Sequence, residues 1–139
     1  MTSSGLINKM SASSDPEPAM RFFFLIFAAF ALPAAADMSG GDVYDSTCRE
    51  CHADGKLNAP KLGDRERWKK LIREGLDDII PEALHGIREM PAKGGNPALS
   101  DLEVARAVIF MANASGARFA EPTPAKVKQW RKKADAKPR

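Results

Sequence analysis

Both cysteines and one of the two histidines of this 139-residue sequence fall in a single pentapeptide, Cys48-Arg49-Glu50-Cys51-His52. Cys-x-x-Cys-His is the pattern to which c-type haem is attached. Residues three apart on a helical turn face the same way, so Cys48 and Cys51 can each form a thioether with one haem vinyl group. His52 directly follows the second anchor and can place an imidazole nitrogen over the iron. The pentapeptide therefore predicts one covalently bound haem c.

Two other interpretations of the cysteine pair stay open. A structural disulfide or a redox pair would also use Cys-x-x-Cys in an oxidising compartment, usually at a helix start after a strand, and no strand is predicted here. A zinc site needs four ligands. The chain could supply them only from Cys48, Cys51, His52 and His85, and the adjacent Cys51 and His52 would be awkward together. The sequence favours haem over both alternatives.

An electron-carrying haem iron needs a second axial ligand, and a methionine opposite histidine raises the reduction potential. The candidates outside the N-terminal segment are Met38, Met90, Met111 and, as a nitrogen ligand, His85. Met38 lies near the N-terminus that removal of a signal peptide would leave, as described below. Met111 falls on the packing face of a predicted helix. Met90 lies in an irregular loop 38 residues after His52 and is followed by Pro91, which stiffens the backbone. Met90 is the predicted ligand.

A haem enzyme or a ligand-sensing haem domain would instead need an open iron position. For an enzyme such as a peroxidase, only His85 could serve as the distal acid or base, and Met90 argues against a vacant position. The predicted function is outer-sphere transfer of single electrons between redox proteins, with no substrate bond changed and no enzymatic activity.

The elements that must position these residues are predicted to be helices. Residues 42–51 predict a short helix that ends in the motif, and residues 53–63 and 91–99, rich in Gly, Pro and Asn, predict loops. Asp64 is an N-cap for a helix to Glu74, with Gly75 as its stop. Asp77 or Asp78 would cap a further helix that ends at Gly86.

The last of these helices has the clearest signature. Ser100-Asp101-Leu102-Glu103 forms a capping box, and Gly116 ends the helix. The apolar face of this helix is predicted to comprise Val104, Ala105, Val108, Ile109, Met111 and Ala112. No segment shows the period of a strand, so the predicted class is small and all-α.

The N-terminus predicts export. Residues 22–32 are an unbroken apolar run, preceded by Arg21 and followed by Pro33-Ala34-Ala35-Ala36. This pattern is typical of a secretory signal peptide cleaved after Ala36, and the run is too short to span a bilayer. Translation is predicted to start at Met20. Residues 1–36 are thus an N-terminal extension with a signal peptide, and the mature protein, residues 37–139, is predicted to be periplasmic.

Charge divides the mature chain into two parts. Residues 37–115 carry 11 basic and 14 acidic side chains, whereas residues 116–139 carry 8 basic and 2 acidic ones. The basic C-terminal tail, residues 117–139, is predicted to be loosely ordered, with helix possible after Pro124. It could contact an anionic membrane surface or an acidic redox partner, or simply aid solubility. We predict no nucleic-acid partner and a monomer.

The sequence resembles class I cytochromes c, and within them the short bacterial c-five type, from about residue 40 to residue 116. The matching stretches are Gly40 with Tyr44, Cys48 to His52, Ala59 to Asp64, Trp68, Ala83-Leu84 with Gly86, Met90-Pro91 with Lys93-Gly94-Gly95, and Phe110-Met111. The chain lacks the second cysteine pair of the c-five type, where it reads Asn96-Pro97-Ala98-Leu99. Arg88 and Ala92 also stand where that type usually has Gly and Pro.

The resemblance implies a small helical fold wrapped around the haem of a class I cytochrome c. It implies that His52 is the proximal and Met90 the distal iron ligand, and that the Pro60 carbonyl accepts the other ring N–H of His52. It also implies that Leu62, Trp68 and Leu84 line the haem pocket, and that the first and last helices of residues 37–116 cross near Gly40 and Phe110. Basic residues could surround the exposed haem edge and steer acidic partners: Arg49, Lys56, Lys61 and Lys93.

Overall fold

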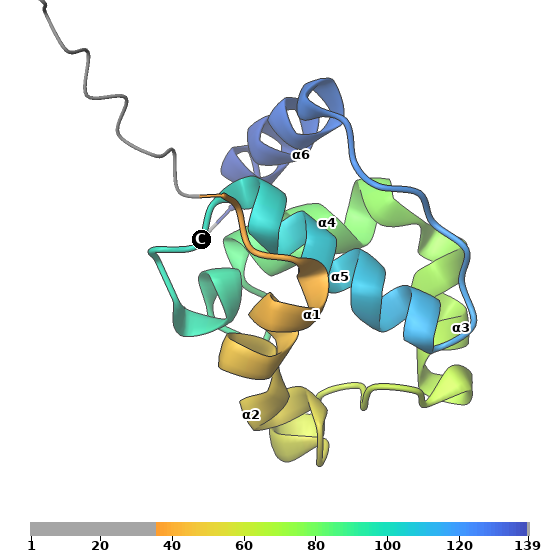
Figure 1. Ribbon diagram of the computed structural model, residues 1–139. Helices are drawn as coiled ribbons and strands as arrows, with labels where there is room; N and C mark the ends of the chain where they lie inside the picture. Colours follow the sequence, from red (N-terminus) through yellow and green to blue (C-terminus); the bar gives the residue numbers. More distant parts are fainter. Residues whose placement is uncertain (1–35, 139) are drawn as a thin grey trace, which may run out of the picture. The chain divides into compact units, whose positions relative to one another are not determined.

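A computed structural model describes residues 36–138, and the predicted signal peptide lies almost wholly outside this range. The elements are α1 (Gly40–Val43), a π-helical turn η1 (Tyr44–Cys48), α2 (Arg49–His52), a 3₁₀ turn η2 (Lys56–Asn58), α3 (Arg65–Glu74), α4 (Leu76–His85), a 3₁₀ turn η3 (Ala92–Gly95), α5 (Asp101–Ala114) and α6 (Pro124–Asp135). Within residues 36–138 the only extended pairing is an isolated bridge between Ile87 and Met90. The predicted all-α class is confirmed (Figure 1). No helix in this range is long and apolar enough to cross a membrane.

The first helical segment begins two residues earlier than predicted and runs without interruption through α1, η1 and α2. The side chain of Ser39 caps it by accepting the N–H of Asp42 at 3.2 Å. Gly40 lies directly on α5, where an added Cβ would come within 2.3 Å of the Arg106 carbonyl oxygen. The ring centroids of Tyr44 and Phe110 are 5.6 Å apart. The predicted crossing of these two helices is confirmed, and only glycine permits it to be so close.

Two of the three predicted N-caps are confirmed. The carboxylate of Asp64 accepts the N–H of Arg67 at 3.2 Å, and Ser100 and Glu103 form the predicted capping box. The prediction for α4 was wrong, because its N-cap is Gly75 rather than Asp77 or Asp78. Gly75 has φ 84°, a conformation that favours glycine, and it both ends α3 and starts α4. The two aspartates lie instead in the first turn of α4, where negative charge is favourable.

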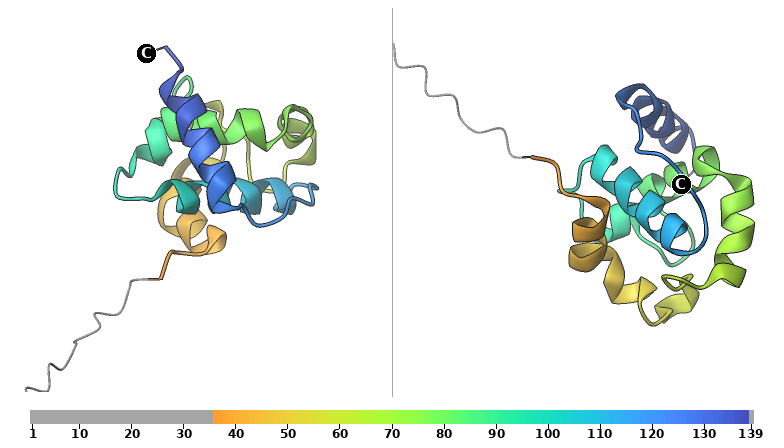
Figure 2. Two further views of the ribbon diagram at one scale, coloured as in Figure 1. Left: turned by 90° about the horizontal axis from the view of Figure 1, so that it is seen from above. Right: turned by 45° about the vertical axis from the view of Figure 1, so that its right-hand side comes forward.

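The core lies between α1, α4 and α5, and the predicted apolar face of α5 is buried throughout. The main cluster of buried residues comes chiefly from α4 and α5, and it also contains Val43, Leu99 and Trp130. A second cluster contains Tyr44, Trp68, Met111 and Ala112. The short segments that carry the pentapeptide and the loop after it lie at one end of this core (Figure 2).

The C-terminal tail differs from its prediction. Helix after Pro124 is present, but the tail is not loosely ordered, because α6 packs on α4 and α5 (Figures 1 and 2). Trp130 is only 3% exposed, and its Nε1 donates to Asp77 at 2.7 Å. Val127, Trp130 and Ala134 recur at helical spacing and form the apolar stripe that faces the core.

Charge explains the same docking. Lys126 pairs with Asp77 at 3.0 Å, and Lys133 pairs with Asp78 at 2.6 Å. Lys137 reaches Glu82 at 3.7 Å, so the basic tail meets the acidic face of α4 in the same chain. These cations are engaged within the fold. A contact of the tail with a membrane or an acidic partner would depend mainly on Lys128 and Lys132, which are exposed and form no ion pair with the residues that the structure describes.

Replacing Trp130 with alanine should lower the free energy of unfolding by about 3–5 kcal/mol, because it empties a buried aromatic site and removes the hydrogen bond to Asp77. The measurement is denaturant unfolding of the holoprotein. Lys128→Ala, an exposed change on the same helix, should stay within about 0.5 kcal/mol of the wild type. Equal midpoints for the two variants would contradict the docking of α6.

Candidate haem-binding site

Cys48 and Cys51 lie on one continuous helical stretch, at the end of η1 and within α2. Both are partly buried free thiols. The backbone at Cys48 and Arg49 is right-handed helical, so a spacing of three residues brings both side chains to the same side. Burial raises the pKa of the Cys48 thiol to about 11, which keeps it neutral at physiological pH. The pair therefore presents two thiols side by side on one helical surface.

His52 is buried, with 7% of its surface exposed, although it is the last residue of α2. Its ring Nδ1 lies 2.8 Å from the Pro60 carbonyl oxygen, which is the hydrogen bond predicted from the resemblance. Because a carbonyl only accepts, Nδ1 carries the proton and Nε2 keeps its lone pair for a metal. The arrangement fixes the tautomer and orientation of the imidazole, as is typical of metal-bound histidines.

The segment that carries the Pro60 carbonyl is itself held from three directions. The N–H of Leu62 donates to the His52 carbonyl at 2.8 Å, and Trp68 Nε1 donates to the Lys61 carbonyl at 2.8 Å. The N–H of Gly63 donates to the hydroxyl of Ser115 at 3.0 Å. Ser115 is 1% exposed, and sequence reasoning missed it. A serine just past a helix end carries no local signal of a partner 52 residues away.

Met90 is partly buried and packs against the main core cluster. Its backbone is tied to the end of α4, since Met90 and Ile87 exchange two hydrogen bonds of 2.9 Å. The start of η3 also lies close to the end of α4, because a Cβ on Gly86 would lie 2.9 Å from the Ala92 nitrogen. Met90 thus lies in a loop whose first residues are fixed against α4.

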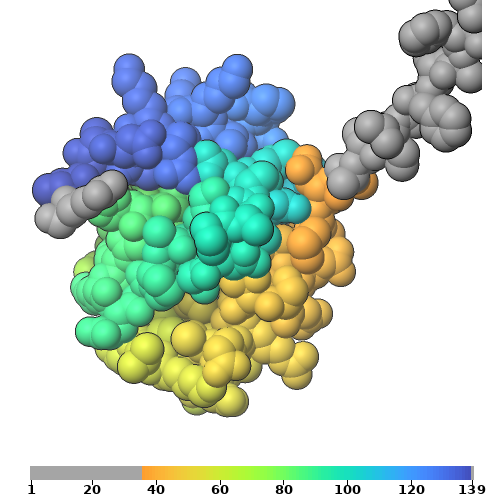
Figure 3. Space-filling model, turned by 90° about the vertical axis from the view of Figure 1, so that its left-hand side faces the viewer, coloured from red at the N-terminus to blue at the C-terminus, as the bar shows by residue number. Residues whose placement is uncertain are grey.

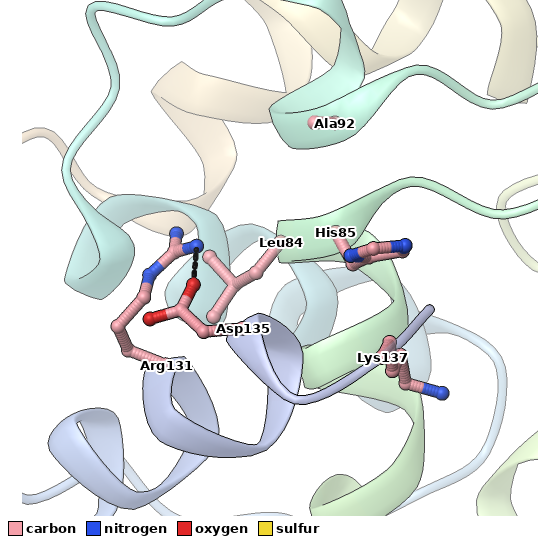
Figure 4. Close-up of a pocket in the computed structure, with 6 residues that line it drawn as sticks. All are labelled: Leu84, His85, Ala92, Arg131, Asp135 and Lys137. Atoms are coloured by element: carbon pink, nitrogen blue, oxygen red, sulfur yellow. Dashed lines mark hydrogen bonds and ion pairs between the residues drawn. The ribbon is translucent and has the colours of Figure 1, made fainter. Parts of the chain in front are cut away.

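The other candidate ligands have different surroundings. Met111 is 2% exposed within the second core cluster, which fits the core role expected for it. Met38 packs on the main cluster, and its N–H donates to Glu103 at 3.0 Å. His85 ends α4 at an open cavity of about 700 Å³, with Ala92 and three residues of the C-terminal segment around it (Figure 4).

The predicted pocket residues fall into two apolar clusters. Trp68 and Leu62 belong to the second cluster, and Leu84, 2% exposed, belongs to the main one. Cys48 packs against both clusters. Two thiols, one oriented imidazole and a thioether loop, with apolar side chains around them, form a donor set that fits a covalently held haem. A zinc site gains no support, since no three His, Cys, Asp or Glu side chains among residues 36–138 are grouped to hold a metal ion.

The basic residues predicted around the haem edge are not equivalent. Arg49 and Lys56 are exposed and pair with Asp45 and Glu50. Lys61 is exposed. Lys93 does not fit the prediction of an exposed steering charge, because its side chain is only 21% exposed and turns toward Asp101, 3.4 Å away.

Comparison with known proteins agrees with this site. Residues 35–111 match the family model described as cytochrome c oxidase, cbb3-type, subunit III. The chain is 40% identical over 91 residues to cytochrome c-555 of Chlorobaculum tepidum, covering 63% of this chain and 82% of that protein. It is 42% identical over 72 residues to cytochrome c5 of Azotobacter vinelandii, covering 50% of this chain and 87% of that protein.

A similar solved structure is a chain in the crystal structure of an electron transfer complex of nitrite reductase with cytochrome c. The TM-score is 0.54 at 38% sequence identity, and the match covers 57% of this chain and 96% of that one. The likeness therefore extends to the fold as well as the sequence.

Trp68→Phe should lower the free energy of unfolding by about 1–3 kcal/mol, because it replaces the buried indole with a smaller ring and removes the donor to the Lys61 carbonyl. Denaturant unfolding with an unchanged slope measures this. Lys69→Ala, an exposed change on the same helix, should leave the midpoint unchanged. A Trp68→Phe midpoint equal to that of the wild type would mean that this bond does not anchor the Pro60 segment.

Proposed function

Because this chain belongs to the class I cytochromes c, we propose that it is an exported electron carrier with one haem attached to Cys48 and Cys51 and ligated by His52 and Met90. Members of this family carry a covalently bound haem c and transfer electrons rather than convert a substrate. The observation that carries the assignment of residues is the buried His52, which is oriented by the Pro60 carbonyl and adjoins two thiols on one helical surface.

Each protein group has a defined task in this proposal. Cys48 and Cys51 would each hold one vinyl group of the haem through a thioether, formed by addition of the thiol S–H across the double bond, so no oxidant would be needed. His52 Nε2 provides a lone pair while its Nδ1–H stays on the Pro60 carbonyl. The Met90 thioether would provide the second protein ligand to the iron. When bound, the haem iron supplies a one-electron couple between its ferric and ferrous states.

The apolar surroundings contribute the remaining control. Trp68 and Leu84 are almost fully buried, and Leu62 packs against the cluster of Trp68. Side chains of this kind exclude water, and burial is one of the means by which a protein sets the potential of a haem. A carrier with both axial positions filled by protein groups gains or loses no ligand when its oxidation state changes.

The partners proposed for this carrier are redox proteins. The similar solved chain was crystallised in an electron transfer complex with nitrite reductase, which supports a protein donor or acceptor. Exposed cations near the pentapeptide, Arg49, Lys56 and Lys61, could steer an acidic partner, although two of them are paired within the chain. Charge of this kind changes association rates and salt sensitivity more than affinity.

Met90→Ala should abolish the weak long-wavelength absorption band of Met–Fe(III) ligation and should let the reduced protein bind carbon monoxide, because the iron loses its sixth ligand. The wild type should show the band and bind no carbon monoxide. Met38→Leu and Met111→Leu are matched controls that should keep the band. A Met90→Ala protein that retains the band would show that the distal assignment is wrong.

The exported protein should begin at Asp37, because Ala34 and Ala36 provide the small residues required before a cleavage site. N-terminal sequencing of the periplasmic fraction measures this directly. Detection of a peptide from residues 1–19 in that fraction would contradict both the start at Met20 and the cleavage.

A further inference from the structure

Helix α6 is connected to the loop that follows Met90 by a network of three charged side chains. Arg131 on α6 donates through Nε and Nη2 to the two carboxylate oxygens of Asp101, at 2.8 and 2.5 Å. Asp101 is the first residue of α5, and its Oδ1 also lies 3.4 Å from the Lys93 ammonium. One carboxylate is therefore shared by a cation from α6 and a cation from the loop.

The network is more enclosed than the other ion pairs of α6. The side chains of Lys93, Asp101 and Arg131 are 21%, 24% and 32% exposed, whereas Lys133 and its partner Asp78 are each at least half exposed. A two-pronged Arg–carboxylate contact fixes geometry as well as charge. Reduced contact with solvent weakens screening. The pKa of Asp101 is lowered, chiefly by the hydrogen bond from Arg131, so the carboxylate is charged at neutral pH.

The loop that contains Lys93 has a backbone conformation that neighbouring groups must hold in place. Lys93 has φ 54°, a left-handed conformation that is strained for a non-glycine residue and persists only where the surrounding structure holds it. Its ammonium also donates to the Leu99 carbonyl at 2.6 Å, which closes the loop on itself. Met90 lies three residues before Lys93, and among residues 36–138 its own backbone is bonded only to Ile87, on the α4 side.

The space-filling view shows where α6 lies against its neighbours (Figure 3). Helix α6, in blue, lies directly against the green and teal surface formed by the segments around α4 and the start of α5 (Figure 3). Figure 4 places Arg131 of α6 on one side of the open cavity and Ala92 of η3 on another. Trp130, next to Arg131 in sequence, anchors α6 in the core.

We propose that α6 clamps the loop that begins at Met90, through Arg131 and Asp101 to Lys93, and so keeps the methionine on the haem iron. Arg131 and Asp101 are then positioning residues for the distal ligand. The inference rests on the proposed function, since it requires Met90 to be that ligand. It gives the C-terminal segment, which the sequence suggested as a surface for membranes or partners, a role inside the protein.

The test is imidazole binding to the oxidised, full-length holoprotein, followed by loss of the long-wavelength band. Imidazole must displace Met90, so its apparent affinity reports the fraction of molecules in which Met90 is off the iron. Arg131→Ala should tighten imidazole binding about tenfold. Arg131→Lys, which keeps the positive charge, should bring the imidazole affinity part of the way back to that of the wild type. The control is Lys133→Ala, which removes a different α6 ion pair, to Asp78, and should stay within about twofold of the wild type.

A second variant guards against a general loss of α6 docking. Lys93→Gln leaves the Arg131–Asp101 contact in place and should also tighten imidazole binding. Because Arg131 acts through Asp101 on Lys93, adding Arg131→Ala to Lys93→Gln should have less effect than Arg131→Ala has alone. Fully additive effects would overturn the clamp.

Two further outcomes would overturn it. Equal imidazole affinities for Arg131→Ala and Lys133→Ala would show that Arg131 has no particular connection to the loop. Weaker imidazole binding by Arg131→Ala would show that Arg131 competes with Lys93 for Asp101. Failure of the proposed function is separate, because it would appear as a Met90→Ala protein that keeps the long-wavelength band.

Discussion

The hydrogen bond between the His52 ring and the Pro60 carbonyl is the interaction on which the rest of the site depends. It selects which imidazole nitrogen is free for a metal, and it does so at the last residue of a short helix. The carbonyl is in place only because neighbouring atoms of residues 61–63 bond to Trp68, His52 and Ser115. These contacts connect the pentapeptide to α3 and to the end of α5. The orientation of the His52 ring therefore depends on how α3 and α5 pack.

The small size of the chain explains much of the remaining architecture. The proposed mature chain of 103 residues would bury only about 65% of its unfolded surface, so its own core would be marginal. The fold contains two apolar clusters that both contact Cys48, and a large apolar cofactor attached there would join them. Helix α6 adds a further layer through Trp130, and its cations neutralise the acidic face of α4. The division of charge along the sequence thus serves the protein's own folding.

The features predicted correctly from the sequence are those determined by near neighbours in the chain. The cap at Asp64 and the capping box at Ser100 depend on residues three positions away, and the pentapeptide contains its own chemistry. The start of α4 was mispredicted because Gly75, an expected helix stop, also serves as the N-cap of the next helix. This dual use depends on its positive φ, which the sequence pattern does not specify.

The features that were missed depend on distant residues. Trp130 and Asp77 are 53 positions apart. The apolar stripe of Val127, Trp130 and Ala134 is short, and the many lysines around it favoured the prediction of a solvated tail. Lys93 was expected to be exposed, because its partner Asp101 is recognisable only once α5 and η3 are placed together. Such pairings are properties of the packed chain. No local composition or spacing predicts them.

The proposed function requires that this chain holds one haem through two thioether bonds in the pentapeptide. Its most direct test is an alkaline-pyridine haem spectrum, combined with the intact mass of protein expressed with haem-maturation machinery. We expect the spectrum of a haem whose two vinyl groups are both saturated, and a mass, unchanged by denaturation, equal to residues 37–139 plus one haem. A colourless protein with the mass of the bare polypeptide would contradict it.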